Sequence, residues 1–296
     1  MRDLDPGFAA HIESGATTLA NCWRIVRTDA VTYGFTDHDT ALSFDGTTFD
    51  PAHGLDGGET AAKLGAQVDT SEIVAVVHAS AISDDDVMLG RLDGATVETW
   101  RVNWSDPEMR HLLRRDTIGE IVREDGVFRV ELRSAQHALN VVKGRVYQSA
   151  CDAELGDTRC GIDLDQAAFK TTASVVAVSG RQNVHVTLAD SFADGWFDFG
   201  RAEWSSGKMA GLRHRIVRQK IDGSATALLL NTPIEDWAAP GDTLTLYAGC
   251  DRRFATCKAK FANGANFRGF PHFPGSDFVL RYPKAGGDYN GQPLFR

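Results

Sequence analysis

Four of the chain's five cysteines lie in two short segments of similar form. Residues 151–160 read CDAELGDTRC, and residues 250–257 read CDRRFATC. Each segment begins with Cys-Asp, contains arginine and ends at a second cysteine, and 89 residues separate the two pairs. Only Cys22 lies elsewhere. In a chain with so few cysteines, this arrangement favours a shared metal or redox site and a fold that brings the two segments together.

The spacing within the pairs bears on which metal site they could form. It is Cys-x8-Cys for Cys151 and Cys160, and Cys-x6-Cys for Cys250 and Cys257. Structural zinc sites usually use pairs about two to four residues apart, because a tight turn directs both thiolates at one ion. A [4Fe–4S] cluster also takes four thiolates, spreads its irons further apart and accepts ligands from longer loops. The spacing favours a cluster but leaves open structural zinc and free or disulfide-bonded cysteines.

Length and composition indicate a soluble chain with room for two domains. Its 296 residues, 43% of them hydrophobic, can bury a core that needs no covalent staple. No apolar run approaches the ~18 residues of a membrane span. The N-terminal sequence MRDLDPGFAAHIESG lacks the features of a secretory signal peptide. We therefore expect folding in the cytoplasm, where structural disulfides are rare, and no membrane insertion.

Charge is unevenly distributed along the chain. The net charge is −9, and residues from Asp251 onward carry eight Lys and Arg against three Asp, or +5, which leaves −14 for residues 1–250. An acidic chain is poorly suited to neutralising nucleic-acid phosphates. We expect no specific nucleic-acid binding, and a basic C-terminal segment that is solvated or faces another subunit.

Residues 1–145 are predicted to form a β-rich N-terminal domain. Short runs of strand-forming residues alternate with turns, and Asp45-Gly46 and Asp125-Gly126 are each placed as hairpin turns. Helices are expected only as short accessories: one after Ser83, whose side chain can cap it, and one in the run AQHALNVV. The fold class is therefore mainly β.

Residues 146–296 are predicted to form a cysteine-cluster domain. Between the cysteine pairs, residues 165–248 contain six or so strand signals with Gly and Asp turns, which favour an inserted small β-barrel or sandwich. Its first and last strands should lie side by side, so that Cys160 and Cys250 can reach one site. After Cys257, residues 258–296 are rich in Gly, Pro and Phe, and we expect an irregular arm. Five phenylalanines are expected to hold this arm on a surface: Phe261, Phe267, Phe270, Phe273 and Phe278.

The enzymatic alternative is a cysteine peptidase that uses Cys22 with the downstream His78. A peptidase nucleophile needs a lowered pKa, commonly at a helix N-terminus. Cys22 lies within the apparent strand TTLANCWRIVR, which favours a buried, unreactive thiol. Other candidate ligands are interpreted as turn, cap or structural residues: 36–39 (TDHD), 83–87 (SDDDV), His214 and His272. No catalytic residue is expected.

The sequence resembles a known family. Its C-terminal half is similar to tail-tip proteins of long-tailed phages, the group that includes the minor tail protein L of phage lambda. The similarity rests on the two cysteine pairs, on AELGDTRCGIDL around Cys160, and on GCDRRFATCKAKFANGANFRGFPHFPG. The N-terminal half, with YGFTDHDTALSFDGTTFDP, resembles the preceding domain of hub proteins from alphaproteobacterial prophages and gene transfer agents.

The resemblance implies a structural baseplate hub with a [4Fe–4S] cluster, whose ligands map onto Cys151, Cys160, Cys250 and Cys257. Such hubs are expected to be homotrimers at the tail tip of a phage-like particle assembled in the bacterial cytoplasm. They link a six-fold ring of distal tail protein to a large three-fold central tip or fibre protein. The acidic balance suits a channel through which DNA exits unbound, because it repels phosphate. The insert between the cysteine pairs is longer here than in the lambda protein.

Overall fold

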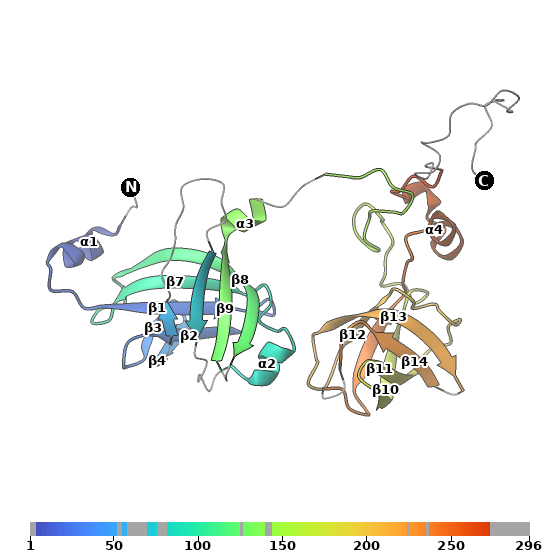
Figure 1. Cartoon of the computed structure of the whole chain (residues 1–296), viewed down its shortest axis with the longest axis horizontal. Helices are drawn as coiled ribbons and strands as arrows, with labels where there is room; N and C mark the ends of the chain where they lie inside the picture. The colour runs from blue at the N-terminus through green and yellow to red at the C-terminus, as the bar shows by residue number, and fades with distance from the viewer. Residues whose placement is uncertain are drawn as a thin grey trace, which may run out of the picture. The chain divides into compact units, whose positions relative to one another are not determined.

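The computed structural model describes residues 4–51, 55–57, 70–75, 82–124, 127–139, 144–223, 225–234 and 237–272. The predicted turn at 125–126, His78, and the arm residues Phe273 and Phe278 lie outside them. The chain divides into two compact units, Met1–Lys143 (unit 1) and Gly144–Arg296 (unit 2) (Figure 1). Within the described ranges, no helix is long and apolar enough to cross a membrane. The expectation of a mainly β fold is confirmed.

Unit 1 contains one nine-stranded sheet, in the order β3-β4-β2-β1-β7-β8-β9-β6-β5. Neighbouring strands are antiparallel except for β2 and β4, which are parallel. The strands are β1 (Leu19–Val26), β2 (Thr32–Thr36), β3 (Leu42–Phe44), β4 (Thr47–Pro51), β5 (Leu55–Gly57), β6 (Thr70–Ala75), β7 (Thr96–Asn103), β8 (Arg110–Glu124) and β9 (Val127–Ser134). In the described part of unit 1, three short helices accompany them: α1 (Pro6–Glu13), α2 (Asp84–Met88) and α3 (Ala135–Leu139).

Local sequence explains several of these elements. Asp45 and Gly46 both have positive φ (46° and 70°), the conformation that a two-residue hairpin turn requires, and they join β3 to β4 as predicted. The Ser83 side chain accepts a hydrogen bond from the backbone N–H of Asp86 and so caps α2.

Alternation along β1 gives the sheet a core on each face. Cys22 belongs to a cluster with Phe44 and Phe49, which are stacked with ring centroids 4.2 Å apart. The next residue, Trp23, belongs to the other cluster, where it is packed with Phe35 and their neighbours. Side chains of consecutive strand residues point to opposite faces, so this one strand contributes to both clusters.

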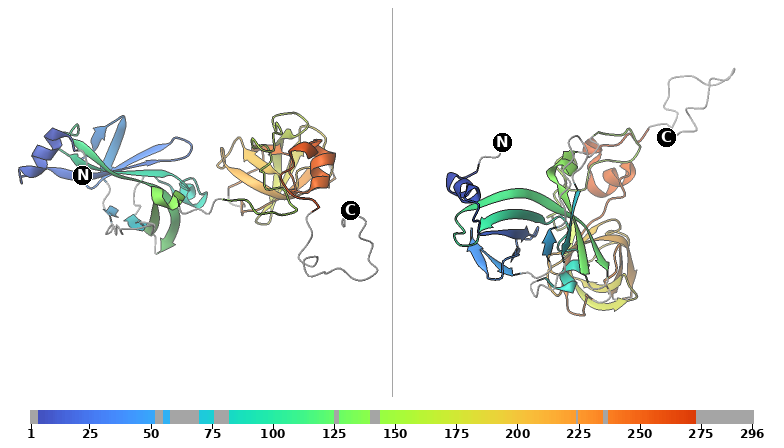
Figure 2. Two further views of the ribbon diagram at one scale, coloured as in Figure 1. Left: turned by 90° about the horizontal axis from the view of Figure 1, so that it is seen from above. Right: turned by 60° about the vertical axis from the view of Figure 1, so that its left-hand side comes forward.

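Unit 2 contains a closed six-stranded barrel, in the order β10-β11-β14-β13-β12-β15, with α4 beyond one end (Figures 1 and 2). Its elements are β10 (Lys170–Ser179), β11 (Asn183–Leu188), β12 (Arg201–Trp204), β13 (Arg213–Asp222), β14 (Ala225–Leu230), β15 (Thr243–Tyr247), α4 (Phe254–Phe261) and the 3₁₀ turn η1 (Gly264–Asn266). β10 pairs with β15 from Lys170–Tyr247 to Ser174–Thr243. The prediction of adjacent first and last strands is therefore confirmed, and the insert is a barrel rather than a sandwich.

The interior of the barrel follows the period of two along its strands. Leu228 and Leu230 on β14, and Leu244 and Leu246 on β15, are at most 1% exposed, whereas the residues between them are partly exposed. Trp204 on β12 fills the interior at 1% exposure. The residues of this apolar core all lie within the insert, residues 165–248.

The start of the predicted arm departs from expectation. Residues 258–261 belong to α4, and Phe261 is buried, with its ring centroid 5.3 Å from that of Phe169 just before β10. Phe267 contacts Phe254 on α4 at 5.1 Å between centroids. The helix forms although its sequence is not strongly apolar, because Phe261 packs against Phe169 and Phe254 packs against Phe267.

Candidate functional site

All four paired cysteines line one cavity of about 280 Å³ between the end of the barrel, the segment before it, and the α4 segment. Cys151 and Cys160 come from residues 151–164, whereas Cys250 and Cys257 come from the chain after β15. Cys22 lies in unit 1, and no disulfide joins any of the five thiols. The fold thus brings to one place the four residues that the sequence singles out.

Arg252 connects the first cysteine of each pair. Its backbone has φ +61°, in the left-handed region, and its carbonyl accepts a hydrogen bond from the Cys151 N–H at 2.9 Å. Its own N–H donates to the Sγ of Cys250 at 3.3 Å. Left-handed backbone is uncommon for a residue with a side chain, so the turn is held by these contacts on both sides.

Gly249 and Gly200 allow two backbone segments to pack tightly just before Cys250. A Cβ added to Gly249 would lie 1.8 Å from the carbonyl oxygen of Asp198, and one on Gly200 would lie 2.2 Å from the carbonyl oxygen of Tyr247. The chain leaving β15 and the chain entering β12 therefore touch through their backbones. This contact fixes the position of Cys250 at the end of the barrel.

Asn263 connects the second cysteine of each pair. Ala262 ends α4 in a left-handed conformation (φ 49°), and the Asn263 N–H then donates to the Cys257 carbonyl at 3.1 Å. The Cys257 thiol contacts the Asn263 carbonyl at 3.3 Å. The Asn263 Nδ2 donates to the Cys160 carbonyl at 2.7 Å and lies 3.7 Å from the Cys160 Sγ. Asn263 lies within the stretch ANGANF, where no local pattern marks it as a site residue.

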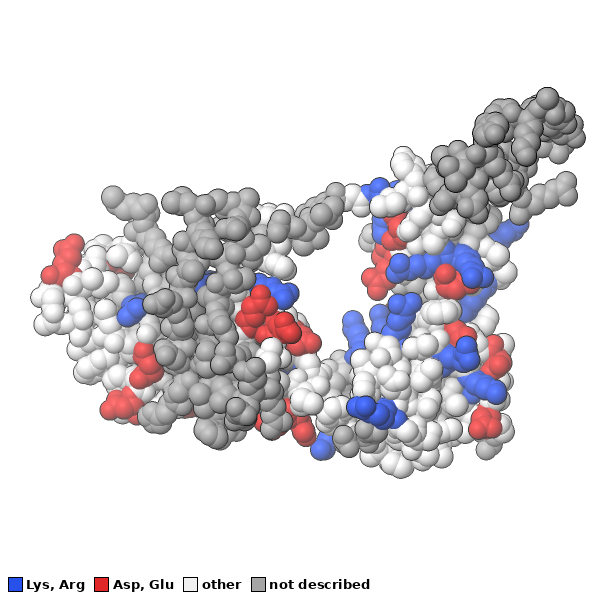
Figure 3. All heavy atoms as spheres, viewed as in Figure 1, with Lys and Arg blue, Asp and Glu red and all other residues white. Residues whose placement is uncertain are grey.

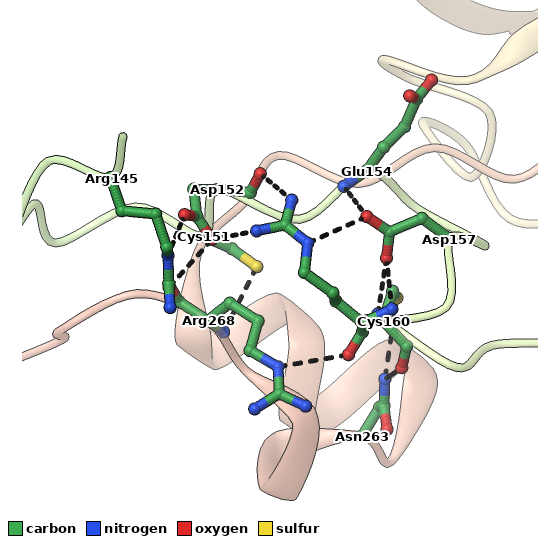
Figure 4. A network of polar contacts seen from close by, with 9 residues as sticks. Arg145, Cys151, Asp152, Glu154, Asp157, Cys160, Asn263 and Arg268 are labelled. Atoms are coloured by element: carbon green, nitrogen blue, oxygen red, sulfur yellow. Dashed lines mark hydrogen bonds and ion pairs between the residues drawn. The ribbon is translucent and has the colours of Figure 1, made fainter. Parts of the chain in front are cut away.

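A network of arginines and aspartates holds the loop between Cys151 and Cys160 (Figure 4). The Asp152 carboxylate accepts hydrogen bonds from Arg145 at 2.6 Å and from Arg159 at 3.3 Å. The Arg145 guanidinium also donates to the Arg268 carbonyl at 3.0 Å. The Arg268 N–H then donates to the Sγ of Cys151 at 3.4 Å. The network thereby ties the α4 side of the cavity to the loop.

Asp157 shapes the turn before Cys160. Its carboxylate accepts from the backbone N–H groups of Cys160 (2.6 Å), Arg159 (2.9 Å) and Glu154 (3.1 Å). The Cys160 N–H is the main reason that the pKa of Asp157 lies below its ordinary value. A charged acceptor with three donors rigidifies this turn.

The sulfur atoms have an environment suited to a bound cationic centre. Burial, followed by repulsion from the other three cysteines, raises the pKa of Cys257 to about 11. Burial is also the largest cause of the raised pKa of Cys250. Four thiolates in one cavity need a metal to offset their charge. Backbone or amide N–H groups point at the sulfurs of Cys151, Cys160 and Cys250, as is typical of iron–sulfur ligands, whose potential such contacts tune.

The four thiols all line the wall of the cavity. Among the described residues, no group of three His, Cys, Asp or Glu side chains is arranged to hold a single metal ion. A [4Fe–4S] cluster takes four thiolates, one for each iron. The four cysteine donors and the hydrogen bonds donated to three of the sulfurs are compatible with that group.

Lys260 is a partly buried cation near Cys250. Its Nζ donates to the carbonyls of Gly249 (2.8 Å) and Trp196 and lies 4.5 Å from the centroid of the Trp196 ring. Burial lowers the pKa of Lys260, and the nearby Cys250 opposes that change. The lysine therefore joins α4 to the base of the barrel.

Cys22 has the environment of a core residue. It is 0% exposed, its thiol contacts the Thr36 Oγ1 at 3.5 Å, and burial raises its pKa to about 11. A nucleophilic cysteine needs a lowered pKa, so this thiol lacks the activation that a peptidase requires. The prediction that Cys22 is buried is confirmed.

The other candidate ligands have structural contacts. Asp37 accepts from the backbone and side chain of Asn21, each at 2.7 Å, and fixes the 36–39 turn. His214 accepts a hydrogen bond from the Trp204 Nε1 at 3.0 Å if its Nδ1 is unprotonated, and burial lowers its pKa. His214 also lines the cavity, which its sequence context does not reveal. His272 is exposed.

Comparisons with known proteins now connect this geometry to a family. A family described as "Baseplate hub protein, N-terminal attachment domain" matches residues 5–163. The chain belongs to the baseplate hub family. A second family, "Phage conserved hypothetical protein BR0599", matches residues 195–277. The hub match includes Cys151 and Cys160, and the second match includes Cys250 and Cys257.

A solved structure shows the same family relationship over nearly the whole length of the chain. A chain in a structure entitled "Virion of native gene transfer agent (GTA) particle" is 37% identical to this hub, with a TM-score of 0.89. The similarity covers 98% of this chain and 100% of that one. No curated protein matches the sequence. The resemblance to phage and gene transfer agent hubs is therefore confirmed.

Proposed function

We propose that this hub is a structural, non-enzymatic protein of the tail tip, stabilised by a [4Fe–4S] cluster bound to Cys151, Cys160, Cys250 and Cys257. The observation that carries the proposal is the convergence of these thiols, from segments 89 residues apart, on one cavity. The cluster would supply four iron–thiolate bonds that fasten the two ends of the barrel insert to α4. Metal binding of this kind contributes directly to folding stability.

The location follows from the family. Baseplate hubs lie at the tail tip, and the similar chain is part of a gene transfer agent virion. We place this chain at the same level of a phage-like particle, as a homotrimer between the six-fold distal tail ring and the three-fold central tip protein. The acidic unit 1 supports a lining for the DNA exit channel, since like charges repel phosphate without binding it.

Metal analysis tests the cluster. Full-length protein purified without oxygen should be brown and contain about four irons and four acid-labile sulfides per chain, the content of one [4Fe–4S] cluster. Colourless protein with about one zinc per chain would establish structural zinc instead. Iron-free and zinc-free protein would contradict a metal site altogether.

Imaging of the assembled particle tests the position. We expect three copies around the tail axis, below the distal tail ring. Six copies at that level, or none, would contradict the proposed symmetry. Trimer formation can depend on the ring above, so the isolated chain is not the material for this experiment.

A further inference from the structure

The barrel contributes basic side chains to the cavity that holds the cysteines. Arg201 on β12 and Arg213 and Arg215 on β13 all line it, together with the four thiols. In Figure 3, Lys and Arg side chains gather on unit 2 over the end of the barrel that carries β12 and β13. Neither the sequence spacing nor the family match assigns a role to these arginines.

Two of them occupy an electrostatically unfavourable arrangement. Arg201 and Arg215 are direct cross-strand partners on β12 and β13. Like charges directly opposite each other on neighbouring strands destabilise a sheet. An anion in the cavity would remove that penalty.

The acidic side chains nearby offset the charges of Arg201 and Arg215 only weakly. Arg213 pairs with Glu203 at 3.1 Å, but Arg201 approaches the same carboxylate only to 3.9 Å. Arg201 stacks on Tyr247 at 4.4 Å, and its buried Nε has no hydrogen-bond partner among the described residues. For Arg215, the side-chain contact in this part of the chain is Phe199, with its guanidinium carbon 6.0 Å from the ring centroid.

The same strands deliver a cluster ligand. Arg201 pairs with Tyr247 at the end of β15, and Cys250 follows three residues later. The backbone contact of Gly249 with Asp198 holds this corner. Arg201 is therefore built into the element that positions Cys250, on a rigid strand rather than on a mobile loop.

We propose that Arg201 and Arg215 form a cationic wall that offsets the negative charge of the thiolate-ligated cluster, and that supplying this wall is a function of the inserted barrel. The inference rests on the proposed cluster. A [4Fe–4S] core with four thiolates is a net anion, and charge and hydrogen bonds near it set its reduction potential. The two positive charges stabilise the reduced cluster more than the oxidised cluster, because the reduced cluster is the more negative of the two.

Neutralising the wall should therefore change properties of the bound cluster. We compare Arg201→Gln, Arg215→Gln and the double variant with Arg218→Gln and Lys220→Gln. Arg218 and Lys220 are exposed cations on β13 that do not line the cavity, so they are matched controls. Each full-length protein is purified without oxygen and assayed for iron, sulfide, loss of visible absorbance in air, and reduction potential.

The expected result is specific in sign. The double variant should bleach several-fold faster in air and have a more negative reduction potential, because the reduced cluster loses two positive charges from the wall of its cavity. The double Arg→Lys variant keeps the charge and should retain a potential close to the wild-type value. The two controls should behave as wild type.

Three outcomes separate the proposals. A wild-type chain without iron overturns both the proposed cluster and this inference. A wild-type cluster with a double variant indistinguishable from the controls overturns the cationic wall alone. Faster bleaching in both the Gln and the Lys double variants, without a change of potential in either, would show a packing role and also overturn it.

Discussion

At the scale of single residues, the aspartates of the two Cys-Asp dipeptides make different contacts. Asp152 accepts hydrogen bonds from Arg145 and Arg159 and holds the loop to the α4 side of the cavity. Asp251 accepts from the Arg253 N–H at 3.0 Å and the Thr256 hydroxyl at 2.9 Å, and so stabilises the start of α4. Similar sequence therefore supports two different turns, each of which presents a cysteine to the same cavity.

Cysteine substitutions should separate the thiols by location. Cys→Ser at Cys151, Cys160, Cys250 or Cys257 should remove most visible absorbance and bound iron, because an iron loses its protein ligand. Cys22→Ser should keep the iron content and lower the free energy of unfolding by about 1–3 kcal/mol through a changed buried polar group. Bleaching by Cys22→Ser, with retained colour in two of the other variants, would contradict the ligand assignment.

Asn263→Ala should weaken the connection between Cys160 and Cys257. The variant removes the 2.7 Å hydrogen bond to the Cys160 carbonyl, and we expect a loss of about 0.5–1.5 kcal/mol in unfolding free energy. Faster release of iron to a chelator should accompany it. Asn183→Ala is the control, because Asn183 is exposed at the start of β11 and does not line the cavity. Equal iron release from both variants would exclude a specific role for Asn263.

Glu98 makes the stability of unit 1 depend on pH. Its carboxylate lies between Arg24 (Nε at 2.7 Å) and Arg115 (Nε at 2.9 Å). Burial acts to raise its pKa, but the hydrogen bonds from the two arginines win and the pKa lies below its ordinary value of 4.5. The contribution of Glu98 to stability is thus complete above pH 4.5 and is lost as pH falls through the lower folded pKa.

Glu98→Gln tests this assignment. The variant should have a lower urea midpoint than the wild type at pH 7, because the partly buried Arg24 and the exposed Arg115 lose the buried carboxylate that they share. The difference should narrow as the pH falls below 4.5. A constant difference over that range would show that lost packing, and not charge, destabilises the variant.

At the scale of secondary-structure elements, the barrel provides a rigid base for the site. β10 and β15 are neighbours, so the chain enters and leaves the barrel at the same place, and the two cysteine pairs are brought together without a long linker. Lys260 and Phe261 then attach α4 to the base of the barrel through Gly249 and Phe169. The order of the barrel strands, rather than the length of the insert, determines that the site can form.

Gly249→Ala should disturb the site through the barrel corner. The added Cβ would lie 1.8 Å from the Asp198 carbonyl oxygen, so the backbone must move. We expect a loss of at least about 1–3 kcal/mol in stability, typical of overpacking, together with lower iron content. Gly144→Ala is the control, because its Cβ would meet nothing within 4 Å. Thermal melts followed by circular dichroism check the pair, and equal melting temperatures would contradict the proposed close contact.

At the scale of the whole molecule, charge separates by unit. Residues 1–143 carry 13 Lys and Arg against 24 Asp and Glu, or −11, whereas residues 144–296 carry 18 against 16, or +2. Most of the acidic excess of residues 1–250 (−11 of −14) therefore belongs to unit 1, and the charges of unit 2 are nearly balanced. The acidic excess and the cavity lined by the four cysteines are thus located in different units.

This division predicts that the units can be separated. Residues 144–296 expressed alone should bind iron, since all four paired cysteines and the whole cavity lie within that unit. Residues 1–143 should fold as a colourless β protein. Iron assays and circular dichroism of both fragments check this. A folded but iron-free 144–296 fragment, next to an iron-containing full chain, would show that unit 1 is needed for cluster binding.

The sequence by itself determined the features that depend on local chemistry. Asp45-Gly46 predicts its hairpin because these residues tolerate positive φ, and Ser83 predicts its helix cap because its hydroxyl reaches the free N–H groups. The cysteine spacing and its family resemblance indicated which four thiols belong together. These signals come from neighbouring residues, so they do not need the rest of the chain.

Only the tertiary structure decided how the site is surrounded. β12 is four residues long and carries Arg201 and Glu203 beside buried Ala202 and Trp204, so it offers little local strand signal. α4 forms because Phe254 and Phe261 contact Phe267 and Phe169. Asn263 contacts Cys160, and Lys260 contacts Trp196 and Gly249, only in the folded unit. The pairing of Arg201 with Arg215 likewise needs the closed barrel. Each depends on burial and charge contributed by residues far away in sequence, and no local pattern records such partners.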